Sequence, residues 1–165
     1  MEMEAIYREV APKLLNYLIG MGSSYAQACD IVQETFLRVW KRRDELLDDM
    51  AQVSGFIFTV ARNYRLDQMR KYGRETLEAE ILDAGSYEAD IGGDEDTAAL
   101  RSRLLQAMAQ LPPLLREAFV LFQVGELSVR EIARQTNASE ANVKVRIHRA
   151  KQRLRELLAD VTFPA

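Results

Sequence analysis

The sequence predicts an all-α fold of two small helical domains joined by a flexible acidic linker, with a helix-turn-helix in the C-terminal domain. Apolar residues recur every three or four positions, alternation at a period of two is scarce, and three of the four prolines avoid the interiors of the long periodic segments. The 165 residues suffice for one ordinary domain or two small ones, and a hydrophobic content of 48% with 28% charged residues is typical of a globular protein.

The predicted N-terminal domain spans residues 1–72 and holds three helices. We expect them at residues 3–19, 25–43 and 54–72, where glycines and serines mark their ends. A block of this size buries little apolar surface on its own. Its helices should therefore depend on the close packing of a few apolar side chains, which are Phe36, Val39, Phe56 and Val60.

An acidic linker is predicted at residues 73–96. One arginine stands against nine acidic residues between positions 73 and 98, apolar periodicity is weak there, and glycines interrupt the stretch. By contrast, residues 99–165 hold eleven Lys or Arg against six Asp or Glu, while residues 1–72 are balanced. The net charge of -3 thus conceals a basic C-terminal domain, which points to an anionic partner.

The chain has neither the apolar run of a transmembrane helix nor the apolar N-terminus of a secretory signal, so we expect no membrane insertion and a cytoplasmic location. The single cysteine, Cys29, cannot form an internal disulfide, and we expect it to be a small buried side chain. The single histidine, His148, lies far from it in sequence, so no metal site and no cofactor are expected. A Gly-rich phosphate loop is also missing, which makes an enzyme the least favoured interpretation.

The predicted C-terminal domain spans residues 97–165 and contains the most specific local pattern. Four helices are expected there, at residues 97–111, 113–124, 128–135 and 139–158. In the third of these, the small Ala133 suits a close approach of two helices. Asn137 suits the following turn because it tolerates left-handed backbone, and Ser139 caps the last helix. This spacing is typical of a helix-turn-helix.

The last helix has an apolar face and a cationic face. Its inward stripe consists of Val143, Ile147, Ala150, Leu154 and Leu158. Six Lys or Arg against two Glu lie between residues 139 and 157. Cationic flanks around a mixed centre suit a helix in the DNA major groove, where charged side chains contact phosphates and central ones contact base edges. A merely solvated face is the alternative, and the helix-turn-helix spacing favours DNA.

The helix predicted at residues 25–43 places one large apolar side chain away from the core. The inward stripe of this helix is Ala28, Ile31, Val32, Thr35, Phe36 and Val39. Leu37 lies on the other side, and the polar residues that flank it are Asp30, Gln33 and Glu34. The pattern predicts a docking patch for another protein, although single exposed apolar residues are ordinary. On this pattern alone the two interpretations are equal.

The helix predicted at residues 54–72 carries aromatic side chains on several sides, interleaved with cations. The aromatic residues are Phe56, Phe58 and Tyr64, and the polar and cationic ones are Arg62, Asn63, Arg65, Arg70 and Lys71. Aromatic faces that stack on bases, beside cations that contact the backbone, are typical of a surface for single-stranded nucleic acid. For Phe56 and Tyr64 the stronger interpretation is that each belongs to the core.

Three segments resemble conserved regions of bacterial sigma factors, in the order and spacing of the extracytoplasmic-function group. Residues 30–40, DIVQETFLRVW, resemble the second region, and residues 58–63, FTVARN, resemble its promoter-melting continuation. Residues 111–119, LPPLLREAF, with the helix-turn-helix that follows, resemble the fourth region. Two departures bear on promoter preference and not on the fold. They are Phe56, where the family often has Trp, and Thr136–Asn137, where Leu-Gly is usual.

The resemblance implies a promoter-specificity subunit of RNA polymerase that is not itself an enzyme. The residues that dock on the clamp helices of the largest subunit of core polymerase would be Asp30, Gln33, Glu34 and Leu37. The residues that hold a flipped base and the unpaired strand of the minus-ten element would be Phe58, Arg62, Asn63, Arg65, Arg70 and Lys71. Those that contact the minus-thirty-five duplex would be Ser139, Glu140, Ala141, Lys144, Val145, Arg146, His148 and Arg149. The family expectation also includes control by a separate anti-sigma protein.

The resemblance also constrains the linker. Promoter elements about 24 base pairs apart are separated by roughly 80 Å. A free chain of this length averages only about 25 to 30 Å from end to end. Polymerase would therefore hold the acidic residues 75–96 extended, in a basic channel meant for nucleic acid.

Two other interpretations remain open from the sequence. A DNA-binding regulator that never joins polymerase would use the same helix-turn-helix, but it would not need the patch within residues 30–40. A helical adaptor that binds only protein, by mimicking a sigma domain, would not retain a basic recognition face. Each alternative therefore leaves one of the two patterns unexplained.

Overall fold

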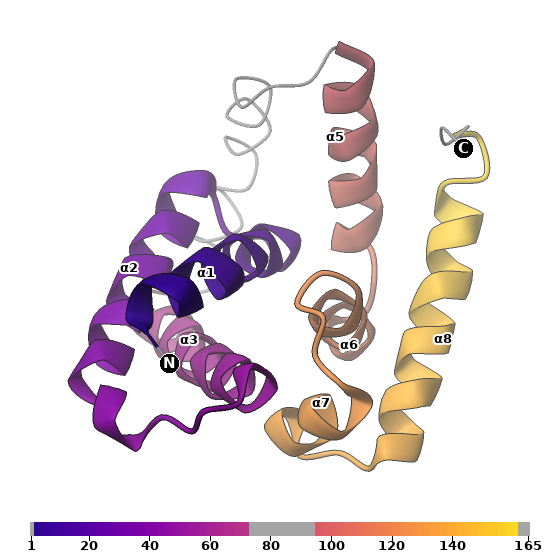
Figure 1. Ribbon diagram of the computed structural model, residues 1–165. Coiled ribbons are helices and arrows are strands. Elements are labelled where there is room, and N and C mark those ends of the chain that lie inside the picture. Colours follow the sequence, from indigo (N-terminus) through magenta and orange to yellow (C-terminus); the bar gives the residue numbers. More distant parts are fainter. Residues whose placement is uncertain (1, 73–94, 162–165) are drawn as a thin grey trace.

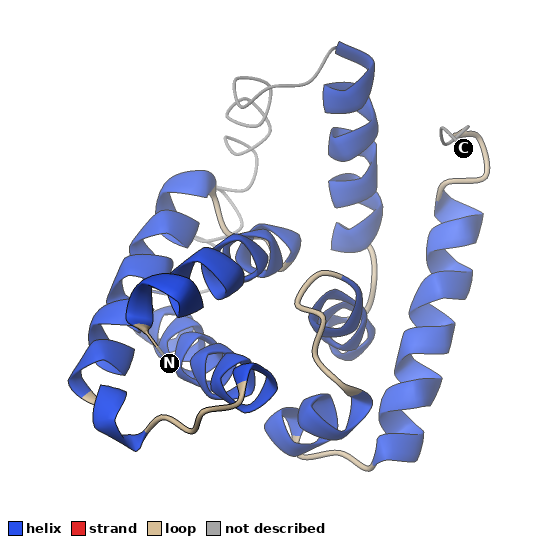
Figure 2. Cartoon of the chain, in the orientation of Figure 1, coloured by secondary structure: helices blue, strands red, loops and turns tan. Residues whose placement is uncertain are grey.

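The computed structural model describes residues 2–72 and 95–161, and they form a helical fold (Figure 1). Helices and their connecting loops account for both stretches, and Figure 2 shows no strand within them. The predicted all-α class is therefore confirmed. Residues 73–94, most of the predicted linker and of the segment expected in a polymerase channel, lie outside the described residues, whereas Glu95 and Asp96 already belong to a helix.

The N-terminal block consists of three helices that pack against one another (Figure 1). They are α1 (Met3–Gly20), α2 (Tyr25–Lys41) and α3 (Met50–Tyr72), with a short 3-10 helix, Arg43–Glu45, between α2 and α3. A capping box starts α2: the Ser24 hydroxyl accepts from the Gln27 N–H at 3.1 Å, and the Gln27 side chain accepts from the Ser24 N–H at 3.2 Å. Every residue of the inward stripe predicted for α2 is buried, so that prediction is confirmed.

The start of α3 differs from the prediction, which placed it at Ser54. The helix begins at Met50 because Asp49 precedes it. The Asp49 carboxylate accepts from the backbone N–H of Ala51 at 3.0 Å, and its carbonyl accepts from the N–H of Val53 at 3.0 Å. An acidic side chain there satisfies a free N–H group of the first turn, which makes Asp49 the effective cap.

The C-terminal block consists of four helices. They are α5 (Glu95–Ala109), α6 (Pro113–Gln123), α7 (Val129–Thr136) and α8 (Glu140–Leu157). The hydroxyls of Ser128 and Ser139 cap α7 and α8 by accepting from the N–H groups of Glu131 and Asn142, each at 3.1 Å. Asn137, between these helices, has a left-handed backbone with φ of 53°. The helix-turn-helix is thus confirmed, as is the buried stripe of α8.

The two blocks share one apolar core. Buried residues from both of them form a single cluster within the described parts of the chain, and α1 packs directly against α6. Gly20 permits this approach, since a Cβ at that position would lie 3.0 Å from Cγ1 of Val120. The two units that the sequence predicts as separate domains are therefore in direct contact.

The turn residue Asn137 offers a test of the helix-turn-helix geometry. A left-handed backbone costs residues with a branched Cβ about 1–2 kcal/mol and costs glycine almost nothing. We expect Asn137→Val to lower the free energy of unfolding by about that amount. The substitution Asn137→Gly should leave it unchanged or raise it slightly. Chemical denaturation followed by circular dichroism measures both, and equal destabilisation by the two variants would contradict this role of the turn.

Candidate nucleic-acid interface

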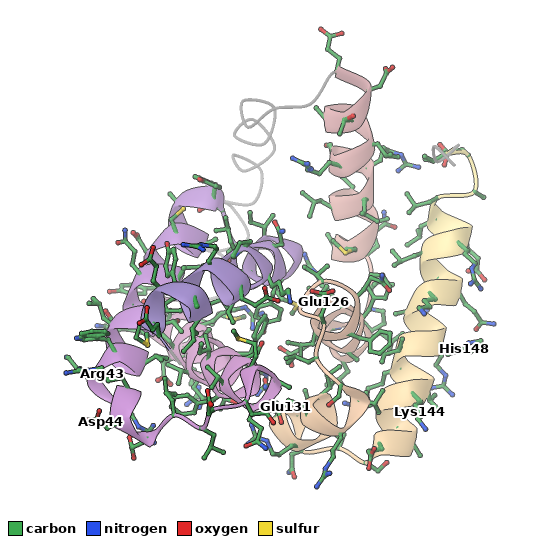
Figure 3. All side chains as sticks on the ribbon, viewed as in Figure 1. Arg43, Asp44, Glu126, Glu131, Lys144 and His148 are labelled. Atoms are coloured by element: carbon green, nitrogen blue, oxygen red, sulfur yellow. The ribbon has the colours of Figure 1, made fainter. Side chains whose placement is uncertain are left out.

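The outer face of α8 is open to solvent in its N-terminal half. Lys144 and His148 point away from the rest of the molecule (Figure 3), and Val145 beside them is 44% exposed. All eight residues predicted to contact duplex DNA are at least partly exposed, and they are Ser139, Glu140, Ala141, Lys144, Val145, Arg146, His148 and Arg149. The N-terminus of the helix adds positive partial charge at the same end. The arrangement can accept a polyanion along one face of α8.

The residues predicted on α3 for single-stranded DNA fall into two groups. Asn63, Arg70 and Lys71 are exposed. The remaining three, Phe58, Arg62 and Arg65, lie under the C-terminal block. The structure therefore does not bring the six residues together on one open surface.

Phe58 requires a correction. Its side chain has no exposed surface. The ring packs edge to face on Tyr17 with 5.5 Å between centroids, and a Cβ at Gly125 would lie 3.0 Å from its Cε1. The prediction that Phe58 presents an aromatic face to a base is wrong for this structure, because the ring fills the core between the two blocks.

Arg62 joins α3 to two helices of the C-terminal block. Its Nε and Nη2 donate to Oε1 of Glu117 on α6 at 3.0 and 2.9 Å, and its Nη1 donates to the backbone carbonyl of Gln135 on α7 at 3.1 Å. Arg65 Nη1 lies 3.8 Å from Oε2 of the same carboxylate. Arg65 and Glu117 are each only 8% exposed, so in this arrangement Arg65 is not accessible to DNA.

Tyr17 completes the cluster around Glu117. Its hydroxyl donates to Oε2 of Glu117 at 3.2 Å, and burial raises the pKa of Tyr17, so the phenol stays protonated. Burial alone would lower the pKa of Arg62, but hydrogen bonding and charge attraction by Glu117 raise it above its ordinary value. Two guanidinium groups therefore face one carboxylate, and the cluster keeps a surplus positive charge.

A second set of hydrogen bonds holds α7 along α3. Gln135 Nε2 donates to the carbonyl of Gly55 at 3.0 Å, and Arg134 Nη2 donates to Thr59 Oγ1 at 3.0 Å. Glu131 orients that arginine by accepting from its Nε at 3.1 Å. A Cβ at Gly55 would lie 2.6 Å from Oε1 of Glu131, so a larger residue there would displace the end of this side chain. Glu126 and Glu131 lie on the side of the C-terminal block that faces the N-terminal block (Figure 3).

The predicted docking patch on α2 faces solvent beside an apolar groove. Asp30 and Gln33 are exposed, Glu34 is half-buried, and Leu37 is 58% exposed. Gln33 and Leu37 also line the groove, which has a volume of about 580 Å³, and its other lining residues are Met3, Glu4, Tyr7, Phe36 and Trp40. The sequence analysis did not predict the groove residues of α1, which are Met3, Glu4 and Tyr7. Met3 and Tyr7 lie beside core positions of that helix, so the sequence pattern does not set them apart from core residues.

Within residues 2–72 and 95–161, no group of His, Cys, Asp and Glu side chains is placed to hold a metal ion. Cys29, which we expected to be buried, is half-buried and its thiol is free. None of the helices in these ranges is long and apolar enough to span a membrane.

Comparison with known proteins gives matches in both blocks. Residues 6–75 match the profile described as Sigma-70 region 2, and residues 101–154 match the one described as Sigma-70, region 4. The chain is 30% identical to the ECF RNA polymerase sigma factor SigM of Bacillus subtilis, over 95% of this chain and 95% of that protein. It is 31% identical to the RNA polymerase sigma factor CarQ of Myxococcus xanthus, over 96% of this chain and 90% of that protein.

A solved structure is also similar. It is that of the sigma factor RpoE from Bartonella quintana in complex with the anti-sigma factor NepR. The TM-score is 0.72 at 25% sequence identity, and the match covers 94% of this chain and 96% of that chain. The structural likeness therefore extends over both helical blocks.

The contact of Glu131 with its neighbours should make stability depend on pH. Burial raises the pKa of Glu131, but hydrogen bonds from Arg134 and Gln135 and the attraction of Arg134 outweigh it, so the pKa lies below the ordinary value of 4.5. A lowered pKa stabilises the folded state above the ordinary pKa, and this contribution is lost as the pH falls through the lowered pKa. We expect Glu131→Gln to be less stable than the wild type at pH 7 and the difference to shrink below pH 4.5. Urea denaturation at several pH values measures it, and a difference that is constant with pH would contradict the ion pair.

Proposed function

The chain belongs to the extracytoplasmic-function (ECF) family of RNA polymerase sigma factors, and from this premise we propose a role for each surface described above. A sigma factor joins core RNA polymerase and directs promoter-specific initiation of transcription, and this protein does so through regions 2 and 4. It contributes binding and positioning, and we assign the chemistry of RNA synthesis to core polymerase. We infer that it acts in the cytoplasm, where core polymerase and promoter DNA are found.

The open face of α8 is our candidate for reading the minus-thirty-five element as duplex. Ala141, Val145 and His148 lie along the centre of that face with Lys144 beside them, where side chains reach base edges in a major groove. Arg146 and Arg149 flank them and would contact phosphates. The observation that carries this proposal is that all eight predicted residues are at least partly exposed, while the opposite side of the helix is buried against the rest of the block.

On α3, we propose that Asn63, Arg70 and Lys71 provide the part of the minus-ten surface that is accessible in this arrangement. Arg62 and Arg65 would join them once α6 and α7 leave α3. Strand opening requires no covalent bond to be made or broken. Unstacking a base costs a few kcal/mol, and contacts of the protein with the flipped base and with the DNA backbone offset this cost.

The patch on α2 is our candidate for docking on the clamp helices of the largest polymerase subunit. An exposed Leu37 beside acidic and amide side chains gives an apolar centre with a polar rim, which is the usual make-up of a protein interface. An anti-sigma protein is the second expected partner. Support for it comes from the similar sigma factor of Bartonella quintana, which was crystallised with one.

Removal of the acidic rim tests the docking patch and the proposed function together. We expect Asp30→Ala with Glu34→Ala to weaken binding to bacterial core polymerase roughly tenfold or more, because two charged contacts are lost. Run-off transcription from a promoter library should fall in parallel. The matched control, Asp44→Ala with Glu156→Ala, removes two exposed carboxylates from other surfaces and should change neither. Retention of full core binding by the first variant would contradict the docking patch.

The α8 face is tested by the salt dependence of duplex binding. If Arg149 contacts one phosphate, Arg149→Ala should weaken binding to all duplexes alike and reduce the slope of log K against log salt by about 0.9. Arg101→Ala on α5 removes the same charge from an exposed position outside α8 and is the control. Fluorescence anisotropy across a salt series gives both slopes. Equal slopes for the Arg149 variant and the wild type would exclude a phosphate contact at this residue.

A further inference from the structure

We propose that the C-terminal block and unpaired promoter DNA compete for the same face of α3, and that the Glu117 carboxylate holds the covered form by binding the arginines that DNA phosphates would otherwise bind. The proposal rests on the proposed function, because it takes α3 as the surface for the unpaired strand. It adds a self-inhibitory contact that lies within the chain.

The covered face is a continuous stripe of α3. Gly55, Thr59 and Arg62 follow one another at intervals of four and three residues, which places them on one side of the helix. All three bond to residues of α7. Phe58 and Arg65 lie beside them, against α6 and the loop that follows it. These positions include half of the residues that the sequence assigns to the minus-ten element.

Glu117 presents to the arginines the kind of group that a phosphate would present. Arg62 donates two hydrogen bonds to one of its oxygens, at 3.0 and 2.9 Å, and Arg65 faces the other oxygen at 3.8 Å. Guanidinium groups bind carboxylates and phosphates in the same way, through charge-assisted N–H donors. A phosphate and Glu117 therefore cannot occupy this position together.

Glycines make the fit between the blocks specific. A Cβ at Gly20 would lie 3.0 Å from Val120, one at Gly55 would lie 2.6 Å from Glu131, and one at Gly125 would lie 3.0 Å from Phe58. In each case the nearest side chain belongs to the other block. A side chain at Gly20 would press on Val120, and one at Gly55 would displace the carboxyl group of Glu131, which binds Arg134 and Gln135.

The contact is also of a kind that can open. Beside the shared apolar core it contains several polar contacts: apart from the Glu117 cluster, Lys13 pairs with Glu126 at 2.9 Å, and Arg116 Nε donates to the carbonyl of Gly20 at 2.8 Å. Such groups recover water when the blocks separate, so a buried ion pair adds little net stability, whereas loss of one partner leaves the other charge buried and unpaired. Contacts of this polarity between domains are typical of reversible association.

Glu117→Gln provides the main test. The substitution keeps the size of the side chain but leaves Arg62 and Arg65 without a counter-charge, which favours the open form. If the open form is the binding-competent one, apparent affinity for a single-stranded minus-ten oligonucleotide rises in proportion to its population, so we expect about tenfold tighter binding. Binding of minus-thirty-five duplex to α8 should stay unchanged. Small-angle scattering should show a larger radius of gyration.

Two further variants test whether tighter single-strand binding comes from opening of the blocks and not from a change in net charge. Glu156→Gln removes one exposed negative charge from α8 without touching α3, and it controls for a general electrostatic gain in DNA affinity. Gly55→Ala leaves all charges in place and introduces a methyl group 2.6 Å from Glu131. Alanine also favours the helix, so the N-terminal block should fold, and single-strand affinity should again rise.

The outcomes distinguish the proposal from the function on which it rests. An increase in both radius and single-strand affinity for Glu117→Gln and Gly55→Ala, but not for Glu156→Gln, supports the competition. An unchanged radius and affinity in both of the first two variants overturns it, whatever the wild type does with polymerase. If the variants open and still bind no single strand, and if holoenzyme also fails to open promoters, the role of α3 in the proposed function is overturned as well.

Discussion

The guanidinium group of Arg62 is the point on which the arrangement of this molecule depends. It reaches from α3 to a carboxylate on α6 and to a backbone carbonyl on α7, and so fixes two helices of one block against the other. Apolar contacts between the blocks, such as Val120 beside Gly20, join their cores into a single cluster. A small helical block gains from such sharing, because it cannot bury enough apolar surface alone.

Polar and apolar contacts between the two blocks have different effects on how the blocks are arranged. Apolar burial across the junction favours any close approach of the blocks. The hydrogen bonds select one orientation, since Arg62, Gln135 and Arg134 each require a partner at a defined place. The helix-turn-helix is internally capped by its own serines and does not need these contacts for its local geometry. Its recognition face therefore keeps its shape whether or not the blocks touch.

Periodicity within single helices predicted a large part of the fold. The buried stripes of α2 and α8 were predicted residue by residue, because each is a local pattern that α-helical geometry converts directly into one face. The left-handed turn at Asn137 followed from side-chain chemistry in the same way. On α3 this reasoning failed for Phe58, since an aromatic residue at helical spacing has the same pattern whether its own block or the other one covers it.

Long-range contacts explain why the candidate site was predicted only in part. The partners of Arg62 are separated from it by 55 and 73 positions in the chain, and no local pattern relates them. The sequence pattern does not distinguish Glu117, since a Glu next to Arg116 is equally typical of a charged helix surface. The exposed residues of α8 and α2 required no such partner, because a position opposite a buried stripe is exposed wherever the rest of the chain lies.

The uncovered face of α8 has a consequence for how the protein searches a chromosome. Cationic side chains along a rigid helix favour duplex of any sequence through release of counterions, and they permit sliding along it. On the assignments proposed above, the covered form retains the means to scan double-stranded DNA, while the proposed strand-binding face of α3 is occupied by the carboxylate of Glu117. The proposed competition on α3 would thus separate duplex binding by α8 from strand opening, because the two functions use different faces and only one of these faces is covered.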